Sequence, residues 1–220
     1  MNVIRRNHNN VKRELINKYI KPKSLVLDVG CGQGGDILKW KQLGVYLAMI
    51  DPHGPSLEEA NRRLISTGYH AAVHQGLVQH SPDMEYDAVC YNFALHYIFE
   101  THKNFMFSMR QIARRVRKGG VFLGCIPDSV FVTMNPAYTD KYGNTIRKRG
   151  DTVDIMLVDT PYYTSSTGRP MARSEPIAHK ELLLTWMENN GFRLLEWSPI
   201  CKERTGTISD LYSQFCFLRL

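Results

Sequence analysis

The chain has 220 residues, 43% of them hydrophobic, which is enough to bury a large core and excludes a disordered or fibrous protein. No run approaches the ~18 consecutive apolar residues of a membrane span, and the amino terminus lacks a signal peptide's apolar segment, so we expect an intracellular protein with no membrane partner. The net charge of +7 favours anionic partners, and the five cysteines show neither disulfide nor metal-site spacing, so we expect no metal.

Short apolar runs alternate with longer amphipathic stretches through the first half of the chain. The runs predict strands and the stretches predict helices, as in a parallel sheet that is covered on both faces. The predicted strands are 24–29, 45–50, 71–73, 86–91 and 120–126, and the predicted helices are 35–43, 56–67 and 102–117. The basic run at 114–118 ends the last of these helices, where cations balance the helix dipole, so we assign it to structure.

Residues 127–176 interrupt this alternation. They are rich in Pro, Gly, Thr, Tyr and Arg and are too long for a plain connection, so we interpret them as an irregular, substrate-binding excursion within a single domain over 1–220, rather than a passive insertion. After them the pattern predicts a helix over 180–190 and strands over 192–197 and 211–220. A loop joins these two strands, so the last one can run antiparallel.

A glycine-rich loop, LDVGCGQGGD, follows the first predicted strand and opens a helix. Gly30, Gly32 and Gly35 have the spacing G-x-G-x-x-G, and Asp51 ends the second strand about twenty residues later, where a carboxylate can accept both ribose hydroxyls of an adenosine cofactor. NAD and S-adenosylmethionine both carry that ribose. Asp28 would repel a pyrophosphate and attract an ammonium group, which favours S-adenosylmethionine.

Three segments, LDVGCGQGGDILKWK, IDPHGPSLEEANRRL and YNFALHYIFE, resemble the mRNA cap guanine-N7 methyltransferases, which depend on S-adenosylmethionine. HNNVKRELI upstream and SEPIAHKELL and ISDLYSQFCFL downstream look like further segments of that family, so the resemblance spans most of the chain. It implies an α/β, Rossmann-like class I methyltransferase fold, with a seven-stranded, mainly parallel sheet, an antiparallel last strand and helices on both faces. The implied activity is transfer of a methyl group to N7 of the guanosine cap of mRNA.

The same resemblance implies two sets of site residues. The cofactor set is Arg13, with Lys12 as its alternative, Asp28, Gly30, Asp51, Gln75, Asn92 and Tyr97. The cap and RNA set is Asn9, Asn10, Gln33, Lys39, Arg63, His96, Glu175 and Tyr212. Two positions depart from the family: Gln33 replaces a lysine on the expected path of the triphosphate, and Gln75 replaces an aspartate near the adenine, although its carbonyl can still accept a hydrogen bond.

Guanine N7 has a free lone pair and no proton to lose, so its attack on a sulfonium methyl requires no general base. We therefore expect catalysis by proximity and orientation and name no catalytic acid, base or nucleophile. The resemblance implies that Glu175 accepts the N1 and N2 protons of guanine, that His96 bonds O6 and that Tyr212 packs on the base. Arg147, Lys148 and Arg149 in the excursion are candidates for contact with the RNA backbone.

Two other interpretations stay open: a methyltransferase for a small molecule or another RNA position, and a silent fold member that acts as a binding subunit. Beyond capped RNA, we expect partners among other capping domains, a guanylyltransferase and a triphosphatase, in the same chain or complex. The compact length predicts an excised domain or a viral enzyme, working in the host cytoplasm if viral and in the nucleus if cellular.

Overall fold

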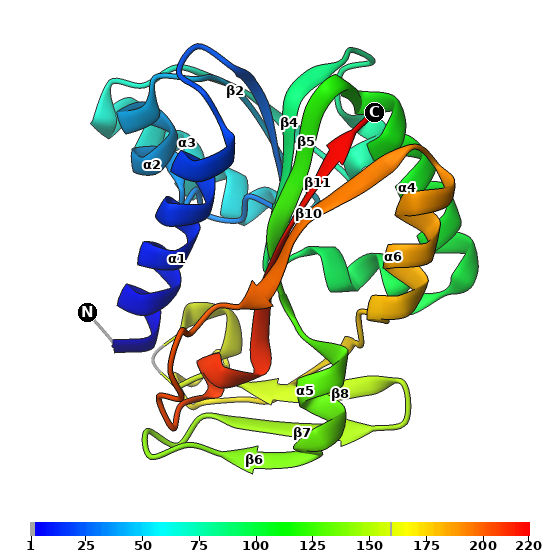
Figure 1. The fold of residues 1–220 in the computed structure, drawn as a ribbon. Coiled ribbons are helices and arrows are strands. Elements are labelled where there is room, and N and C mark those ends of the chain that lie inside the picture. The colour runs from blue at the N-terminus through cyan, green and yellow to red at the C-terminus, as the bar shows by residue number, and fades with distance from the viewer. Residues whose placement is uncertain (1–2, 159) are drawn as a thin grey trace.

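The computed structural model describes residues 3–158 and 160–220, and a seven-stranded sheet forms its centre (Figure 1). The order across the sheet is β10-β11-β5-β4-β1-β2-β3. Its strands are β1 (Leu25–Val29), β2 (Tyr46–Asp51), β3 (Ala71–Gln75), β4 (Tyr86–Asn92), β5 (Val116–Pro127), β10 (Phe192–Pro199) and β11 (Tyr212–Arg219). β11 is antiparallel to β5 and β10, whereas β1 to β5 pair in parallel, as predicted.

Helices cover both faces of this sheet (Figure 1). α1 (Val3–Tyr19), α2 (Ile37–Leu43) and α3 (Gly54–Thr67) lie on one face, and α4 (His102–Arg115) and α6 (Lys180–Asn189) lie on the other. Consecutive strand residues point to opposite faces, so Val26 packs into the core under α1 to α3 and Leu27 into the core under α4 and α6. The 17-residue helix α1 is an element that the sequence pattern did not predict.

The excursion at 127–176 is folded rather than irregular, which corrects the prediction. After α5 (Ser129–Met134) it forms a four-stranded antiparallel sheet of β6 (Ala137–Thr139), β7 (Thr145–Arg149), β8 (Thr152–Met156) and β9 (Arg173–Pro176). Gly150 turns at φ 60° between β7 and β8, and Ile146, Val153 and Ile155 are buried on one face. This face joins the core under α1, so the small sheet is attached to the large one (Figure 1).

Short 3-10 helices connect these elements: η1 (Val78–His80), η2 (Leu95–Glu100), η3 (Pro161–Tyr163) and η4 (Ile208–Leu211). The five cysteines are all free. Within 3–158 and 160–220, no helix has the length and apolar character needed to cross a membrane.

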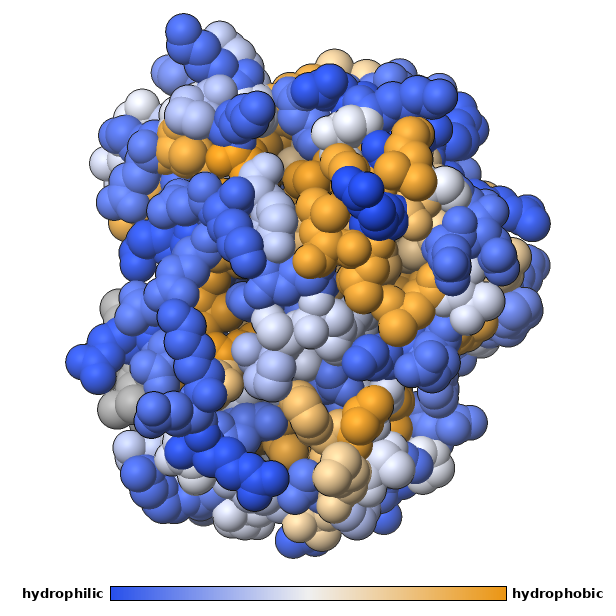
Figure 2. Space-filling model, viewed as in Figure 1, coloured by the Kyte–Doolittle hydropathy of each residue, from blue (hydrophilic) through white to orange (hydrophobic). Residues whose placement is uncertain are grey.

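The surface is largely polar, with an apolar area where β10 crosses the molecule (Figure 2). β10 is an edge strand, and its Leu194 and Leu195 are exposed. The basic run at the end of α4 makes contacts within the protein, in keeping with the predicted structural role: Arg115 is buried and binds Ser81, while Arg114 and Arg117 pair with Asp83 and Asp87.

Candidate functional site

The glycine-rich loop after β1 turns tightly at the carboxyl edge of the large sheet. Gly30 has φ 70°, and a Cβ there would lie 2.3 Å from that of Ala94, so only glycine fits. Gly32 has φ 52°, and the space around its Cβ position is open. The third glycine with a positive φ is Gly34, at 72°. Gly35, which the G-x-G-x-x-G spacing selected, has no positive φ, so the spacing identified the wrong glycine of the two.

Asp51 joins this loop to the end of β2. Its Oδ2 accepts a hydrogen bond from the Gly32 amide at 2.9 Å, and its Oδ1 accepts one from the His53 amide at 2.8 Å. A carboxylate has about four lone-pair sites, so Asp51 can accept further hydrogen bonds from a ligand that lies over the loop. Gln75 lies beside Asp51 in the β2–β3 register and donates to the Pro52 carbonyl oxygen, which leaves its own carbonyl oxygen free to accept.

Asp28 lies beneath the loop. It is buried, and its Oδ2 accepts a hydrogen bond from the Trp40 indole at 2.9 Å. Burial and the nearby negative charge of Asp36 raise the pKa of Asp28 to about 7. Asp28 therefore supports the loop from inside and changes its charge near neutral pH.

Asp36 is the charge centre of the site, and the sequence analysis did not select it. Its Oδ1 lies 2.7 Å from Lys12 Nζ and 2.6 Å from Lys39 Nζ, and its Oδ2 accepts a hydrogen bond from Asn92 at 2.9 Å. Burial alone would raise the pKa of Asp36, but the two ammonium groups lower it to about 2. The signal was present in the sequence, since an Asp three residues before a Lys at the start of a predicted helix favours an ion pair.

Lys39, predicted to contact the cap, is engaged within the protein. It is buried, and its ammonium donates to Asp36, to Asn9 Oδ1 at 2.9 Å and to the Gly35 carbonyl at 3.3 Å. An ammonium has three N–H donors, so a phosphate would have to displace one of these partners. Asn9, also predicted for the cap, thereby joins α1 to the loop.

Helix α1 presents Lys12 rather than Arg13 to the loop. Lys12 is largely buried beside Asp36 and lies 5.8 Å from the centre of the Phe93 ring. Arg13 is exposed and donates to Asn10 Oδ1 at 3.2 Å. Of the two candidates for this cofactor contact, Lys12 has the position, while Arg13 and Asn10 lie on the outer face of the helix.

The end of β4 connects the loop to a second group of residues. Asn92 Oδ1 is buried and has no hydrogen-bond partner within the described chain. Phe93 follows at φ 60°, a costly conformation for a residue other than glycine. His8 stacks on its ring at 4.8 Å and Tyr212 contacts it edge-on at 5.5 Å, so aromatic packing from α1 and β11 holds the strained residue.

His8 was not predicted as part of the site. Its Nε2 lies 2.9 Å from Ser209 Oγ, which ties α1 to η4. Burial, together with the Lys12 charge, lowers the pKa of His8 to about 3, so the imidazole is neutral at physiological pH. The segment HNN gave no sign of this packing role.

Glu175 of β9 is the centre of the second group. It is 2% exposed, and its Oε1 accepts hydrogen bonds from Tyr163 at 2.8 Å and Tyr97 at 3.1 Å. Its Oε2 lies 2.9 Å from His96 Nε2. Burial opposes ionisation, but the hydrogen bonds from His96, Tyr163 and Tyr97 lower the pKa of Glu175 overall. The pKa values of Tyr97 and Tyr163 are raised, chiefly by burial, so both tyrosines remain donors.

His96 and Tyr97 come from η2, directly after the Phe93 turn. His96 is 2% exposed; its Nε2 lies against Glu175 Oε2, and its Nδ1 is buried with no hydrogen-bond partner within the residues that the structure describes. Tyr97, predicted for the cofactor, lies in the Glu175 group and shares a 2.7 Å hydrogen bond with Tyr162. The structure thus brings His96, Tyr97 and Glu175 together, with Tyr212 also near enough for Glu175 to raise its pKa further beyond the effect of burial.

Several predicted residues lie outside these two groups. Gln33 is exposed in the loop, and Arg63 of α3 pairs with Glu59 at 2.8 Å. In β7, Arg147 is exposed, Lys148 donates to the Gly150 carbonyl and Arg149 pairs with Asp154. These cations are available to a ligand only from the outer surface.

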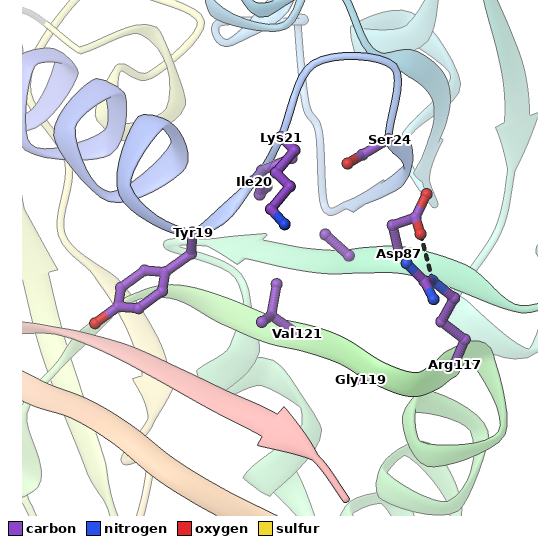
Figure 3. Close-up of a pocket in the computed structure, with 9 residues that line it drawn as sticks. Tyr19, Ile20, Lys21, Ser24, Asp87, Arg117, Gly119 and Val121 are labelled. Carbon is purple, nitrogen blue, oxygen red and sulfur yellow. Dashed lines mark hydrogen bonds and ion pairs between the residues drawn. The ribbon is translucent and has the colours of Figure 1, made fainter.

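A hollow of about 110 Å³ lies at the opposite edge of the large sheet (Figure 3). Ser24, Asp87 and Gly119 line it near the amino ends of β1, β4 and β5, with Lys21 beside them. The glycine loop follows the carboxyl end of β1 and Asn92 ends β4, so both lie at the edge where such sheets bind ligands. The hollow is therefore separate from the candidate site.

The site consequently has two chemically different parts. The loop with Asp51 and Asn92 offers carboxylate and amide acceptors and an open backbone. The group at Glu175 offers a buried carboxylate and a histidine whose Nδ1 has no partner in the described chain. No cluster of three or more His, Cys, Asp or Glu side chains suited to a metal ion occurs in the described ranges.

Comparisons with known proteins bear on the family of the chain. Residues 2–152 match a family model described as the mRNA (guanine-N(7))-methyltransferase domain. The mRNA cap guanine-N(7) methyltransferase of Saccharomyces cerevisiae is 35% identical over 165 residues, 65% of this chain and 38% of that protein. Its Eremothecium gossypii counterpart is 33% identical over 144 residues, 58% of this chain and 33% of that protein. The chain thus spans less than half the length of these relatives.

Solved structures of low sequence identity share the fold. An S-adenosylmethionine-dependent methyltransferase from Clostridium acetobutylicum aligns with a TM-score of 0.71 at 12% identity, covering 97% of this chain and 91% of that one. The glycopeptide N-methyltransferase MtfA, complexed with S-adenosylmethionine, aligns with a TM-score of 0.66 at 11% identity over 97% and 94%. The predicted Rossmann-like class I methyltransferase fold is therefore confirmed.

Proposed function

Because the chain belongs to the mRNA (guanine-N(7))-methyltransferase family, we propose that it transfers a methyl group from S-adenosylmethionine to N7 of the guanosine cap of mRNA. The observation that carries this proposal is the group of side chains around Glu175. A buried, ionised carboxylate beside a histidine whose Nδ1 has no partner in the described chain matches the donors and acceptors on the edge of guanine. A generic methyl-transfer fold has no need of such a group.

The residues around the loop suit S-adenosylmethionine. In our proposal Asp51 accepts the ribose hydroxyls and Asn92 Oδ1, buried without a partner in the described chain, accepts a hydrogen bond from the cofactor. Lys12 is the cation available to its carboxylate, and Gln75 can accept a hydrogen bond from the adenine amine. Gly30 and Asp28 shape the loop from below.

S-adenosylmethionine, when bound, supplies an electrophilic methyl group on a sulfonium. The protein's part is to hold guanine N7 in line with that methyl group, an effect worth about 7 to 11 kcal/mol when orientation is good. Glu175 would accept the N1 and N2 protons and so favour the positive charge that develops on the base. His96 would bond O6, and Tyr212 would pack against the ring. N7 has no proton to lose, so no side chain acts as a base.

The proposal also covers the substrate, the cellular location and the partner domains of the enzyme. Capped RNA is the proposed substrate, with Arg63 and the cations of β7 as candidates for its phosphates and Gln33 at the loop. The curated relatives named above are fungal cellular proteins, which favours a cellular enzyme working in the nucleus over a viral one. Since the chain spans only part of these relatives, other capping domains remain proposed partners.

The direct test measures methyl transfer from labelled S-adenosylmethionine to RNA with a GpppN end and to the same RNA with a triphosphate end. We expect transfer to the capped RNA alone. Equal transfer to both RNAs, or transfer only to small molecules, would indicate another methyltransferase. Calorimetry distinguishes a silent binding subunit, which would bind capped RNA without binding the cofactor.

A further inference from the structure

The Glu175 carboxylate accepts more hydrogen bonds than a base-reading carboxylate can keep. Oε1 accepts from both Tyr163 and Tyr97, and Oε2 faces His96. Each oxygen has two lone-pair sites, so Oε1 is full and Oε2 has one site left. Guanine presents two adjacent donors, N1–H and N2–H, and one is directed at each oxygen. One tyrosine must therefore leave Oε1 when the base binds.

Tyr97 is the donor that can leave. Its bond to Oε1 is the longer one, at 3.1 Å, and its side chain is 40% exposed. It also has a second partner, because its hydroxyl lies 2.7 Å from that of Tyr162. When the base takes the lone pair, the single Tyr97 proton can turn to the Tyr162 oxygen and remain bonded.

Tyr163 has no such alternative. It is 8% exposed, its bond to Oε1 is 2.8 Å, and within 3–158 and 160–220 its hydroxyl has no other hydrogen-bond partner. Leaving Glu175 would bury an unpaired hydroxyl, which costs about 1–3 kcal/mol. Tyr163 therefore stays on Oε1 whether or not the base is present.

We propose that Tyr163 is the positioning residue that orients the Glu175 carboxylate for the guanine edge, while Tyr97 yields its place to the base and turns to Tyr162. This inference rests on the proposed function, since it assumes that Glu175 reads guanine. Both Tyr163 and Glu175 lie beyond residues 2–152, the part of the chain that matches the family model. The donor therefore comes from the small sheet and its η3 connection rather than from the methyltransferase core.

Tyr163 also acts on the charge of Glu175. The titratable groups that face this carboxylate are His96 and Tyr97 from η2, Tyr163 from η3 and Tyr212 from β11. Hydrogen bonds to the ionised form lower its pKa, so removing the Tyr163 hydroxyl raises the pKa of Glu175. More Glu175 is then protonated at low pH, and the acid limb of the activity profile moves to higher pH.

The test compares Tyr163→Phe with the wild type, using Tyr142→Phe as a matched control. Tyr142 is an exposed tyrosine between β6 and β7, on the same small sheet. The measurements are kcat/KM on guanosine-capped and inosine-capped RNA across pH, S-adenosylmethionine affinity by calorimetry, and Tm. The inosine cap lacks the N2 amine and presents one donor fewer.

We expect Tyr163→Phe to lower kcat/KM on the guanosine cap about tenfold, as for loss of a charge-assisted hydrogen bond. The loss on the inosine cap should be smaller, the acid limb should move to higher pH, and cofactor affinity should not change. Tyr142→Phe should match the wild type throughout. An unmoved acid limb, or equal losses on the two caps, would assign Tyr163 a purely structural role and overturn the inference. A wild type that methylates neither cap overturns the proposed function as well.

Discussion

At the scale of single residues, the site depends on carboxyl groups whose pKa values are shifted in opposite directions. Asp36 faces two ammonium groups and is ionised, whereas Asp28, buried beside Asp36, has a pKa near neutrality. Glu175 is ionised because three protein donors outweigh its burial. The protonation state of each carboxyl group therefore depends on its burial and on the neighbouring side chains, not on whether it is an aspartate or a glutamate.

Asp28→Asn tests this difference through stability. The folded-state pKa of Asp28, about 7, is above its ordinary value of 3.8, so its contribution to stability is present below about pH 4 and is lost as pH rises through 7. The asparagine can still accept from Trp40 but does not titrate. We expect the Tm of the variant, relative to that of the wild type, to rise as the pH increases from about 4 to about 7 and to change little above that. A Tm difference that is constant with pH would contradict the raised pKa.

Glu175→Gln tests the reading of the base. The glutamine keeps the shape of the side chain but replaces one acceptor oxygen with an NH2 donor that faces the donors of guanine. A mismatch of buried polar groups costs about 1–3 kcal/mol, so methyl transfer to the guanosine cap should fall at least about tenfold. Binding of S-adenosylmethionine by calorimetry should hardly change. An equal penalty on guanosine and inosine caps would show that Glu175 does not read the N2 amine.

At the scale of elements, α1 closes one side of the cofactor loop. Lys12 pairs with Asp36, Asn9 accepts from Lys39 and His8 stacks on Phe93, all from one face of the helix. The far end of α1 is tied to β10, where Lys18 and Tyr19 both donate to Glu196 at 2.7 Å. The helix is therefore fixed at both ends over the site.

Lys12→Met and Arg13→Met form a matched pair that tests this arrangement. Each removes one positive charge from adjacent positions of α1, but only Lys12 bonds a buried carboxylate. We expect Lys12→Met to lower the free energy of unfolding by about 2 kcal/mol, as for a lost charged hydrogen bond, and to weaken cofactor binding. Arg13→Met should do neither in chemical denaturation and calorimetry. Weaker cofactor binding in the Arg13 variant alone would restore Arg13 as the cofactor contact.

The sequence predicted the large sheet well because its central strands β1, β2, β4 and β5 are mostly buried apolar runs separated by amphipathic helices. It did not predict α1, whose segment is strongly polar and acquires its role only by packing on the loop. It also missed the small sheet, because β6 to β9 are short and carry many polar residues. Resemblance selected Glu175 and His96, whereas the roles of Tyr163 and Asp36 were assigned from their contacts.

At the scale of the whole molecule, the small sheet supplies the carboxylate and the large sheet supplies the loop. η2 connects them, since it follows β4 and carries His96 and Tyr97 to Glu175. The net charge of +7 adds a general attraction for RNA. Among the cations of β7, Arg147 is exposed on the outer face, whereas the Lys148 amine donates to the Gly150 carbonyl.

The salt dependence of RNA binding separates these two cations. Arg147→Ala and Lys148→Ala change the net charge equally. If Arg147 contacts a phosphate, its loss should reduce the slope of log affinity against log salt by about 0.7, the value for one contact with a single strand. Lys148→Ala should leave the slope close to that of the wild type. Equal slopes in all three proteins would place the RNA path elsewhere.

The central claim is that the methyl group reaches guanine N7 in the cap. The most direct measurement digests capped RNA after reaction with isotopically labelled S-adenosylmethionine and identifies the labelled nucleoside by chromatography and mass spectrometry. We predict that all of the label is recovered as N7-methylguanosine from the cap. Label in a ribose or in an internal nucleotide, or cofactor binding without any label in RNA, would contradict the account.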